Sequence, residues 1–356
     1  MRAAIYNAPY SIDAQTVPDP TLQTPSDVIV QITAAAVCGS DLWTYRGQST
    51  ALPGSRIGHE FVGEVVEVGS EVKALNRGDW VISPFRYSDG VCVHCRSGLE
   101  SSCLEGGFWG RQVTEAGQAQ LVRVPFAETT LVKALSNGER PPAALVPHLL
   151  TLADVYPTGL HAAVKAGVGP GLTTVVIGDG AVGLCAVLAA RSLGAEQIIA
   201  FGGDYADRRA LAQKFGATVV QPVRGAEAEA AVAEITNGVG ADCVLECVGT
   251  AAAFASGLKM TRPGGTLGYV GLPHGVTVDM AELFPTNITI SGGIAPARHY
   301  IPEVLPAVLK GDVTPGDVFT AALPLEQIDQ AYQLMDQRST IKVLIEPQKD
   351  NHASLS

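Results

Sequence analysis

Three glycines stand between a short apolar run and a segment with helical spacing. The run is Thr173–Ile177, and helical periodicity begins at Ala181. The glycines are Gly178, Gly180 and Gly183. This G-x-G-x-x-G spacing is typical of a tight turn between a parallel strand and the helix that covers it. The pattern therefore predicts an α/β unit in this part of the chain.

The same alternation continues after the glycines. Apolar runs predict strands at 197–201, 218–220, 242–248 and 266–270, and helical spacing predicts helices at 181–193, 206–215, 227–236 and 252–260. Strands that are apolar on both faces and alternate with helices indicate a parallel sheet covered on two sides. We therefore expect a doubly wound sheet of the Rossmann type.

A bound dinucleotide would use the glycines in three ways. Gly178 makes the tight turn, Gly180 lets a pyrophosphate approach the backbone, and Gly183 lets the helix pack closely on the strand. The first helical residues, Ala181 and Val182, offer free N–H groups and a partial positive charge to the phosphates. An ordinary strand-to-helix turn would also accept the motif, but the βα units that follow favour dinucleotide binding.

The end of the second strand bears on the choice between NAD and NADP. A site for NAD usually has an acid there that binds the ribose 2′-OH. Here the strand is followed by Gly202 and Gly203, with Asp204 and Arg208 shortly after. The missing acid leaves room for a 2′-phosphate that Arg208 or Arg209 would neutralise, which favours NADP. Asp204 in the NAD role, with both arginines solvated, is the alternative.

The first part of the chain has a different pattern. Its apolar runs are short, often alternate, and are separated by glycine and proline, which is typical of antiparallel sheet. A chain of 356 residues exceeds what one core usually supports, so we expect two domains. The expected fold class is α/β, with a β-rich domain at 1–155 joined by 296–356 and a dinucleotide-binding domain at 156–295.

Charge and hydropathy exclude some classes of partner. The chain has 24 Lys and Arg against 35 Asp and Glu, a formal net charge of −11. Such a chain repels phosphate backbones and anionic lipids, which argues against nucleic acid or a membrane as the main partner. No window approaches the roughly 18 apolar residues of a membrane span. We expect a cytoplasmic protein that acts on a small molecule.

Three of the seven cysteines, Cys92, Cys95 and Cys103, lie close together in the sequence. In a cytosolic protein of this size such a cluster predicts a metal site rather than a disulfide framework. The cysteines at 185, 243 and 247 lie in apolar contexts and are expected in the core. Other candidate ligands, such as Cys38, His59 and Asp154, are too far apart in sequence to form a local motif.

Several segments together match one known family. They are Val37-Cys38-Gly39-Ser40-Asp41, Gly58-His59-Glu60-Phe61-Val62-Gly63, the cysteine cluster, Pro157-Thr158-Gly159, the glycine motif and Lys342. Over essentially its whole length the chain resembles the medium-chain, zinc-dependent alcohol dehydrogenases. The resemblance implies a GroES-like β-rich catalytic domain beside the Rossmann domain, with the active site in the cleft between them.

The resemblance also implies a catalytic zinc held by Cys38, His59 and Asp154, the last standing where some relatives have cysteine. Glu60 is similar to a carboxylate that in some relatives approaches the metal when it lacks substrate. Ser40 matches the position whose hydroxyl passes the substrate proton towards solvent, although it would also serve as a helix N-cap. Many relatives continue this relay with a histidine where the chain has Trp43, which leaves the later proton path open.

For the cofactor, the resemblance implies contacts beyond the glycine loop. The implied residues are Thr158 beside the nicotinamide, Val270, Gly271, Gly293 and Ile294 at the carboxyl edge of the sheet, and Lys342 at the diphosphate. Each also has an ordinary structural explanation, such as strand burial for Val270 or a turn for Gly271.

The cysteine cluster is similar to the family's structural-zinc lobe, which normally has four cysteines. Asp89 stands where the first would be, and three thiolates with one carboxylate still form a tetrahedral zinc site. His94 is an alternative fourth ligand, and a lobe without metal is a further possibility.

We therefore expect zinc-dependent hydride transfer between a primary or secondary alcohol and NAD(P), giving an aldehyde or ketone. The alternatives are a zinc-free quinone or enone reductase of the same superfamily and a non-enzymatic nucleotide-binding protein. By analogy with relatives, the chain is expected to form a homo-oligomer, either a dimer or a tetramer.

Overall fold

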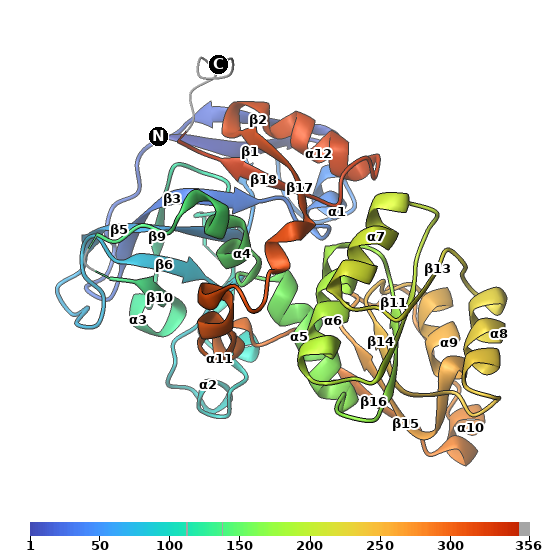
Figure 1. Cartoon of the computed structure of the whole chain (residues 1–356). Coiled ribbons are helices and arrows are strands. Elements are labelled where there is room, and N and C mark those ends of the chain that lie inside the picture. The colour runs from blue at the N-terminus through green and yellow to red at the C-terminus, as the bar shows by residue number, and fades with distance from the viewer. Residues whose placement is uncertain (112, 137, 349–356) are drawn as a thin grey trace. The chain divides into compact units, whose positions relative to one another are not determined.

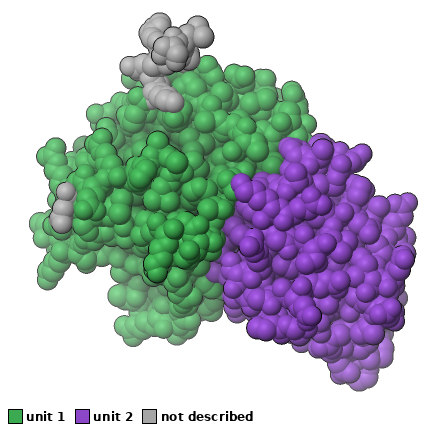
Figure 2. Space-filling view, in the orientation of Figure 1, with its two compact units in different colours: residues 1–154, 296–356 green, residues 155–295 purple. Residues whose placement is uncertain are grey.

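A computed structural model of the chain describes residues 1–111, 113–136 and 138–348. The chain forms two compact units, which Figure 2 colours separately. Unit 1 consists of residues 1–154 and 296–356, and unit 2 of residues 155–295. The first boundary lies one residue before the one expected from the sequence. Among the described residues, no helix is long and apolar enough to cross a membrane.

Unit 2 contains a six-stranded, fully parallel sheet with the strand order β13-β12-β11-β14-β15-β16. Its strands are β11 (Thr173–Ile177), β12 (Gln197–Phe201), β13 (Val219–Gln221), β14 (Ala241–Glu246), β15 (Thr261–Tyr269) and β16 (Thr289–Gly292). Counted from β11 the order is 3-2-1-4-5-6, which is the order of a Rossmann sheet. The doubly wound sheet expected from the sequence is confirmed. The sixth strand, β16, was not expected.

Helices lie on both faces of this sheet (Figure 1). They are α5 (Val155–Ala166), α6 (Ala181–Ser192), α7 (Ala206–Phe215), α8 (Ala226–Ile235), α9 (Ala251–Met260) and the short α10 (Met280–Leu283), with a 3₁₀ turn at Phe284–Thr286. Helix α6 packs against both α5 and α7, and α8 packs against α9. The sheet is buried because its strands are apolar on both faces; Val175, Ile199 and Val244 are fully buried within this core.

Unit 1 is rich in antiparallel sheet, as its alternating runs predict. The larger sheet has the order β10-β6-β5-β3-β18-β17, and β9 also pairs with β3. Its strands are β3 (Val28–Ala36), β5 (Glu60–Val68), β6 (Trp80–Ser83), β9 (Leu121–Val124), β10 (Val132–Leu135), β17 (Phe319–Pro324) and β18 (Lys342–Glu346). A smaller sheet contains β1 (Arg2–Ala8), β2 (Ser11–Thr16) and β4 (Ser55–Arg56), and β7 (Arg86–Tyr87) pairs with β8 (Gly107–Phe108). The C-terminal segment joins unit 1 because β18 pairs with β3.

The helices of unit 1 are mostly short. They are α1 (Asp41–Tyr45), α2 (Val93–Arg96), α3 (Ala127–Thr130), α4 (Val146–Thr151), α11 (Ala297–Lys310) and α12 (Ile328–Asp336), with 3₁₀ turns at Glu100–Ser102, Ala143–Leu145, Pro315–Val318 and Leu325–Gln327. The 3₁₀ turn at Leu325–Gln327 leads directly into α12. Helix α11 was not among the expected helices, and it contains Pro302 and Pro306.

Candidate active site and metal centres

Strand pairing brings Cys38 and His59 together. Cys38 follows β3, His59 directly precedes β5, and these two strands pair antiparallel with Ala36 opposite Glu60. The two side chains therefore lie at the same end of one strand pair although they are far apart in sequence. Asp154, the last residue of unit 1, approaches the same point from the loop before α5.

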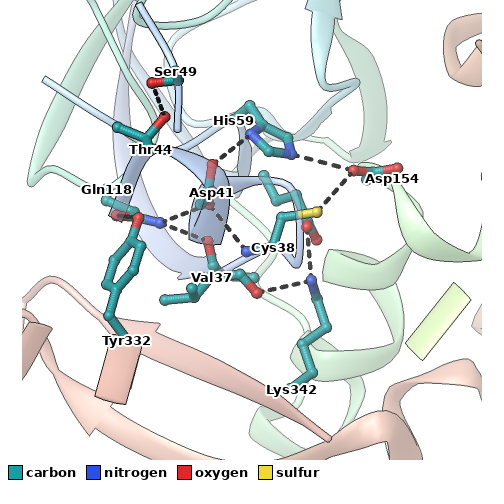
Figure 3. A network of polar contacts seen from close by, with 12 residues as sticks. Val37, Cys38, Asp41, Thr44, Ser49, His59, Gln118, Asp154, Tyr332 and Lys342 are labelled. Atoms are coloured by element: carbon teal, nitrogen blue, oxygen red, sulfur yellow. Dashed lines mark hydrogen bonds and ion pairs between the residues drawn. The ribbon is translucent and has the colours of Figure 1, made fainter. Parts of the chain in front are cut away.

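The three side chains point towards one another (Figure 3). The Asp154 Oδ2 atom lies 3.6 Å from Cys38 Sγ and 3.2 Å from His59 Nε2. With Glu60, the cluster has its potential ligand atoms within 4.8 Å of one another. Tetrahedral zinc, with bonds of 2.0–2.3 Å, holds donor atoms about 3.3–3.8 Å apart. The thiol, imidazole and carboxylate therefore have the chemistry and the spacing of a zinc site.

The charges of this cluster also fit a cation. Burial raises the pKa of the Cys38 thiol, and the charges of Asp154 and Glu60 raise it further. Burial lowers the pKa of His59, but Asp41, Cys38 and Asp154 outweigh it and leave this pKa well above its usual value. An excess of negative charge in a buried site thus keeps the protons on the Cys38 thiol and the His59 imidazole. A divalent cation would supply the balancing charge and allow the thiolate and the neutral imidazole to form.

Lys342 lies beside the metal cluster. Its ammonium is buried, 2.6 Å from Glu60 Oε1 and 3.1 Å from the Val37 carbonyl oxygen. Burial lowers the pKa of Lys342, but Glu60 outweighs burial and raises it. The ammonium therefore forms a buried ion pair beside the metal cluster, and its contact with the diphosphate stays a prediction. The second oxygen of Glu60, Oε2, is buried and has no hydrogen-bond partner among the described residues.

A further carboxylate, which the sequence analysis did not assign, orients the cluster. Asp41 Oδ1 lies 3.2 Å from His59 Nδ1, and Asp41 Oδ2 accepts hydrogen bonds from the Cys38 backbone N–H and the Gln118 side chain. Tyr332 donates to Gln118 Oε1 at 2.9 Å (Figure 3). Asp41 therefore fixes the ring of one ligand and the backbone of another. Its position three residues after Cys38 was the available signal.

The proton-relay candidate lies at the surface. Ser40 is exposed at the N-cap of α1, and its side chain makes no capping hydrogen bond. Trp43 is half-buried on the same helix. His161, by contrast, is buried in α5, and burial lowers its pKa to about 4. It is therefore neutral at physiological pH, in agreement with a structural role.

The second cluster gathers Asp89, Cys92, Cys95 and Cys103, with their potential ligand atoms also within 4.8 Å of one another. The Sγ of Cys92 lies 3.5 Å from that of Cys95 and 3.9 Å from that of Cys103. Zinc–sulfur bonds of 2.3 Å place tetrahedral sulfur ligands about 3.8 Å apart. Within the described part of the chain, His94 is not a member of this cluster, so Asp89 is the fourth ligand that the geometry offers.

Backbone hydrogen bonds stabilise the ionised form of the Asp89 carboxylate. It accepts hydrogen bonds from the backbone N–H groups of Val91 and Cys92 at 2.9 and 3.1 Å. Although burial raises its pKa, these bonds lower it to about 2. Burial raises the pKa values of Cys95 and Cys103, which keeps these thiols protonated until a cation binds. All seven cysteines, including those at 185, 243 and 247, are free thiols, and Cys247 is only half-buried.

The glycine loop of unit 2 has the geometry that a pyrophosphate requires. Gly178 has a φ of +121°, and a Cβ at Gly183 would lie 2.0 Å from the Gly178 carbonyl oxygen. Gly180 is the N-cap of α6, and a Cβ built there meets nothing within 4 Å. No side chain caps α6, so no capping side chain engages its first N–H groups, at Ala181 and Val182.

The other expected cofactor residues lie around the carboxyl edge of the sheet. Val270 and Gly271 follow β15 and donate to the Glu246 carbonyl oxygen, while Gly293 follows β16 and donates to the Tyr269 carbonyl oxygen. Ile294 is 48% exposed, and Thr158 is half-buried in α5. The segments that follow β15 and β16 are neighbours because these two strands pair in parallel.

Arg208 lies in a different environment from the one expected. It is 5% exposed, its Nη1 donates to the Asp179 carbonyl oxygen at 3.0 Å, and its guanidinium lies over the Tyr205 ring. Asp179 in turn accepts the Gly203 N–H at 2.8 Å. Arg208 therefore braces the glycine loop, and the prediction that it neutralises a 2′-phosphate from solvent is wrong.

Comparison with known families accounts for both units. Residues 24–134 match the alcohol dehydrogenase GroES-like domain, and residues 181–310 match the zinc-binding dehydrogenase domain. The first match contains Cys38, His59 and the second cluster, and the second match begins at the helix after Gly180.

Individual proteins resemble the chain over nearly its whole length. The zinc-type alcohol dehydrogenase B of Aspergillus flavus is 35% identical over 352 residues, which is 97% of this chain and 81% of that protein. The solved structure of alcohol dehydrogenase TADH from Thermus sp. ATN1 is 34% identical and has a TM-score of 0.89. The match covers 97% of this chain and 99% of that one. Zinc-dependent alcohol dehydrogenase 2 from Streptococcus pneumonia is 29% identical with a TM-score of 0.87, over 98% of this chain and 99% of that one.

The fold, the two clusters of potential zinc ligands and these relatives all indicate the same family. Neither a zinc-free reductase nor a non-enzymatic nucleotide-binding protein is better supported. The chain belongs to the medium-chain, zinc-dependent alcohol dehydrogenase family, and it is a zinc-dependent alcohol oxidoreductase that uses a nicotinamide cofactor.

Proposed function

We propose that Cys38, His59 and Asp154 hold the zinc at which a primary or secondary alcohol is oxidised. The observation that carries this proposal is the convergence of the three donor atoms in a buried cluster with excess negative charge. Zinc bound there supplies a Lewis acid that stabilises the anionic form of the substrate oxygen. Two anionic donors and one neutral donor balance its charge, and Glu60 is balanced by Lys342.

The overall reaction removes a hydride and a proton from the alcohol. A bound nicotinamide would accept the hydride of the carbinol carbon, which would give an aldehyde or ketone and the reduced cofactor. We assign the proton to Ser40, because its exposed hydroxyl lies two residues after Cys38 and makes no capping bond. Beyond Ser40 the proton reaches solvent without a histidine, since Trp43 stands on the first turn of α1.

The cofactor lies along the carboxyl edge of the Rossmann sheet in this proposal. The open N-terminus of α6 receives the pyrophosphate, and the residues after β15 and β16 face the nicotinamide. NADP is favoured over NAD because β12 is followed by Gly202 and Gly203, without an acid to bind a ribose 2′-OH.

The experiment that tests this function combines metal analysis with an activity screen. The purified chain should contain about two zinc ions, and it should reduce NADP, faster than NAD, with a panel of primary and secondary alcohols. Removal of zinc by a chelator should abolish turnover, and zinc should restore it. Full turnover by chain freed of zinc would contradict the proposal.

The contact of Asp41 with His59 leads to a prediction about zinc affinity. The Asp41→Asn substitution keeps the shape of the side chain but weakens its hold on His59 Nδ1. Because such outer partners orient metal-ligating histidines, we expect zinc affinity to fall about 10–100-fold while the fold is retained. Equilibrium competition with a chromogenic chelator measures the change. Asp336→Asn, which alters an ion pair with Arg46 outside the site, is the matched control and should leave zinc affinity unchanged.

We also propose that Asp89, Cys92, Cys95 and Cys103 bind the second, structural zinc. The distances between their sulfur atoms and the ionised state of Asp89 support this assignment. Free thiols at all seven cysteines fit a reducing compartment, which supports a cytoplasmic location.

We propose in addition that the chain forms a homo-oligomer through the edge of the unit 2 sheet. Strand β16 is the last strand of that sheet, and the segment leading to it carries Leu272, Met280 and Phe284 at 60%, 67% and 85% exposure. An unpaired edge beside exposed apolar side chains is a natural place for a second copy to pair.

The double substitution Met280→Glu and Phe284→Glu should therefore weaken self-association at least tenfold, because it places two like charges on each copy of the interface. Sedimentation equilibrium at micromolar concentrations measures the effect. Val239→Glu changes another exposed apolar residue of the same unit, with 60% exposure, and serves as the control. A wild-type chain that sediments as a monomer would contradict this proposal.

A further inference from the structure

An open pocket of about 540 Å³ lies beyond the carboxyl ends of β12 and β13. It is lined by Gly202, Gly203, Asp204, Val223, Arg224 and the first residues of α8. In a Rossmann sheet the end of the second strand faces the adenosine ribose, so groups in this pocket meet the ribose 2′ position. The pocket therefore decides which dinucleotide fits.

An acidic side chain cannot occupy the usual place at the end of β12. A Cβ built at Gly202 would lie 2.4 Å from Cβ and 2.9 Å from Oδ2 of Asp179. Because the Asp179 carboxylate is already bonded to the Gly203 N–H, the glycine loop leaves no room for a larger residue at 202. The structure thus excludes the ribose 2′-OH acceptor of an NAD site at this position.

Three arginines lie on the segments that follow β12 and β13, and only Arg224 lines the pocket. Arg208 is buried and donates to the Asp179 carbonyl oxygen, and Arg209 forms an ion pair with Asp204. Arg224 is exposed in the pocket lining, and its Nη2 lies 2.8 Å from the position of a Cβ built at Gly203. Among the described residues no carboxylate forms an ion pair with Arg224. Its guanidinium therefore covers Gly203 with an uncompensated positive charge.

We propose that Arg224 selects NADP by binding the 2′-phosphate of the adenosine ribose. A planar guanidinium binds a phosphate with two parallel hydrogen bonds, and the absence of a side chain at Gly203 lets the phosphate approach it. The Arg209–Asp204 pair removes one negative charge from the pocket, while Glu227 remains as an exposed acid at its margin. This inference rests on the proposed nicotinamide cofactor and assigns its specificity to one residue.

The test uses fragments that carry no nicotinamide, so it does not depend on turnover. Isothermal titration of the zinc-loaded full chain with 2′,5′-ADP and with 5′-AMP should show at least tenfold tighter binding of 2′,5′-ADP. Arg224→Gln should weaken 2′,5′-ADP binding about 10–100-fold and change 5′-AMP binding less than twofold. Glu227→Gln should strengthen 2′,5′-ADP binding, because it removes a like charge from the pocket.

Three results would overturn the proposal. Equal binding of both fragments by the wild-type chain would leave the family function intact but remove the preference for a 2′-phosphate. A loss confined to Arg209→Gln, with Arg224→Gln unchanged, would assign the phosphate to the other arginine. Binding of neither fragment at millimolar concentration would contradict the nucleotide-dependent function as well.

Discussion

Asp154→Ala should remove one zinc ion per chain and lower kcat/KM for alcohol oxidation about 10⁴-fold, which corresponds to about 5 kcal/mol. The substitution takes away one of three donors and half of the anionic charge that balances zinc. Cys38 and His59 alone leave a weak two-ligand site. Because substrate activation depends on this ion, the loss should appear in kcat as well as in kcat/KM. Metal analysis and steady-state kinetics on the same preparation measure both effects.

The chain itself offers a matched control for this prediction. Asp89→Ala is the same substitution in the other cluster, so it should remove the other zinc ion while most of kcat is retained. The two variants together separate loss of a zinc ion in general from loss of the ion at the reacting centre. Normal turnover by the Asp154→Ala variant, with two zinc ions still bound, would show that the ligand assignment is wrong.

Cys95→Ser should produce the largest loss of stability. Cys95 is buried at the centre of the second cluster, 3.5 Å from the Cys92 sulfur. The segment 89–106 contains only α2 and a 3₁₀ turn as regular structure, so binding of zinc supplies much of its folding free energy. We expect the free energy of unfolding to fall by about 3 kcal/mol, which lowers the unfolding midpoint by about 6–12 °C. The variant should also lose one zinc ion per chain. Differential scanning calorimetry and metal analysis provide the measurements.

Cys247→Ser is the control for this prediction, because Cys247 is half-buried and belongs to neither cluster. It should retain both zinc ions and shift the midpoint by much less. An unchanged midpoint in Cys95→Ser, or a single zinc ion in the wild-type chain, would favour a lobe that has lost its metal.

Local patterns predicted well those parts of the protein that local geometry decides. The glycines at 178, 180 and 183 predicted the strand–turn–helix unit. A side chain at Gly183 would collide with the Gly178 carbonyl oxygen, so only glycine fits there. The short spacing of Cys92, Cys95 and Cys103 likewise predicted their cluster, because a single loop brings them together.

Helix α11 shows where local propensity failed. Pro302 and Pro306 each remove a backbone donor, which disfavours a helix at these positions. Both prolines lie on the exposed side, whereas Tyr300, Ile301, Leu305 and Val308 are buried on the other. Burial of this apolar face outweighs the lost hydrogen bonds, and only packing against the rest of unit 1 reveals that balance.

The sequence by itself determined the α/β architecture, the glycine turn and the cysteine cluster, because each depends on residues that are close along the chain. Tertiary structure alone decided the partners of distant groups. It placed Lys342 against Glu60, Asp41 behind His59, and Arg208 beneath the glycine loop, which left Arg224 exposed in the pocket. The physical reason is that the charge of a buried group is set by what surrounds it in space, and strand pairing and loop packing fix those surroundings without leaving a signal in the local sequence.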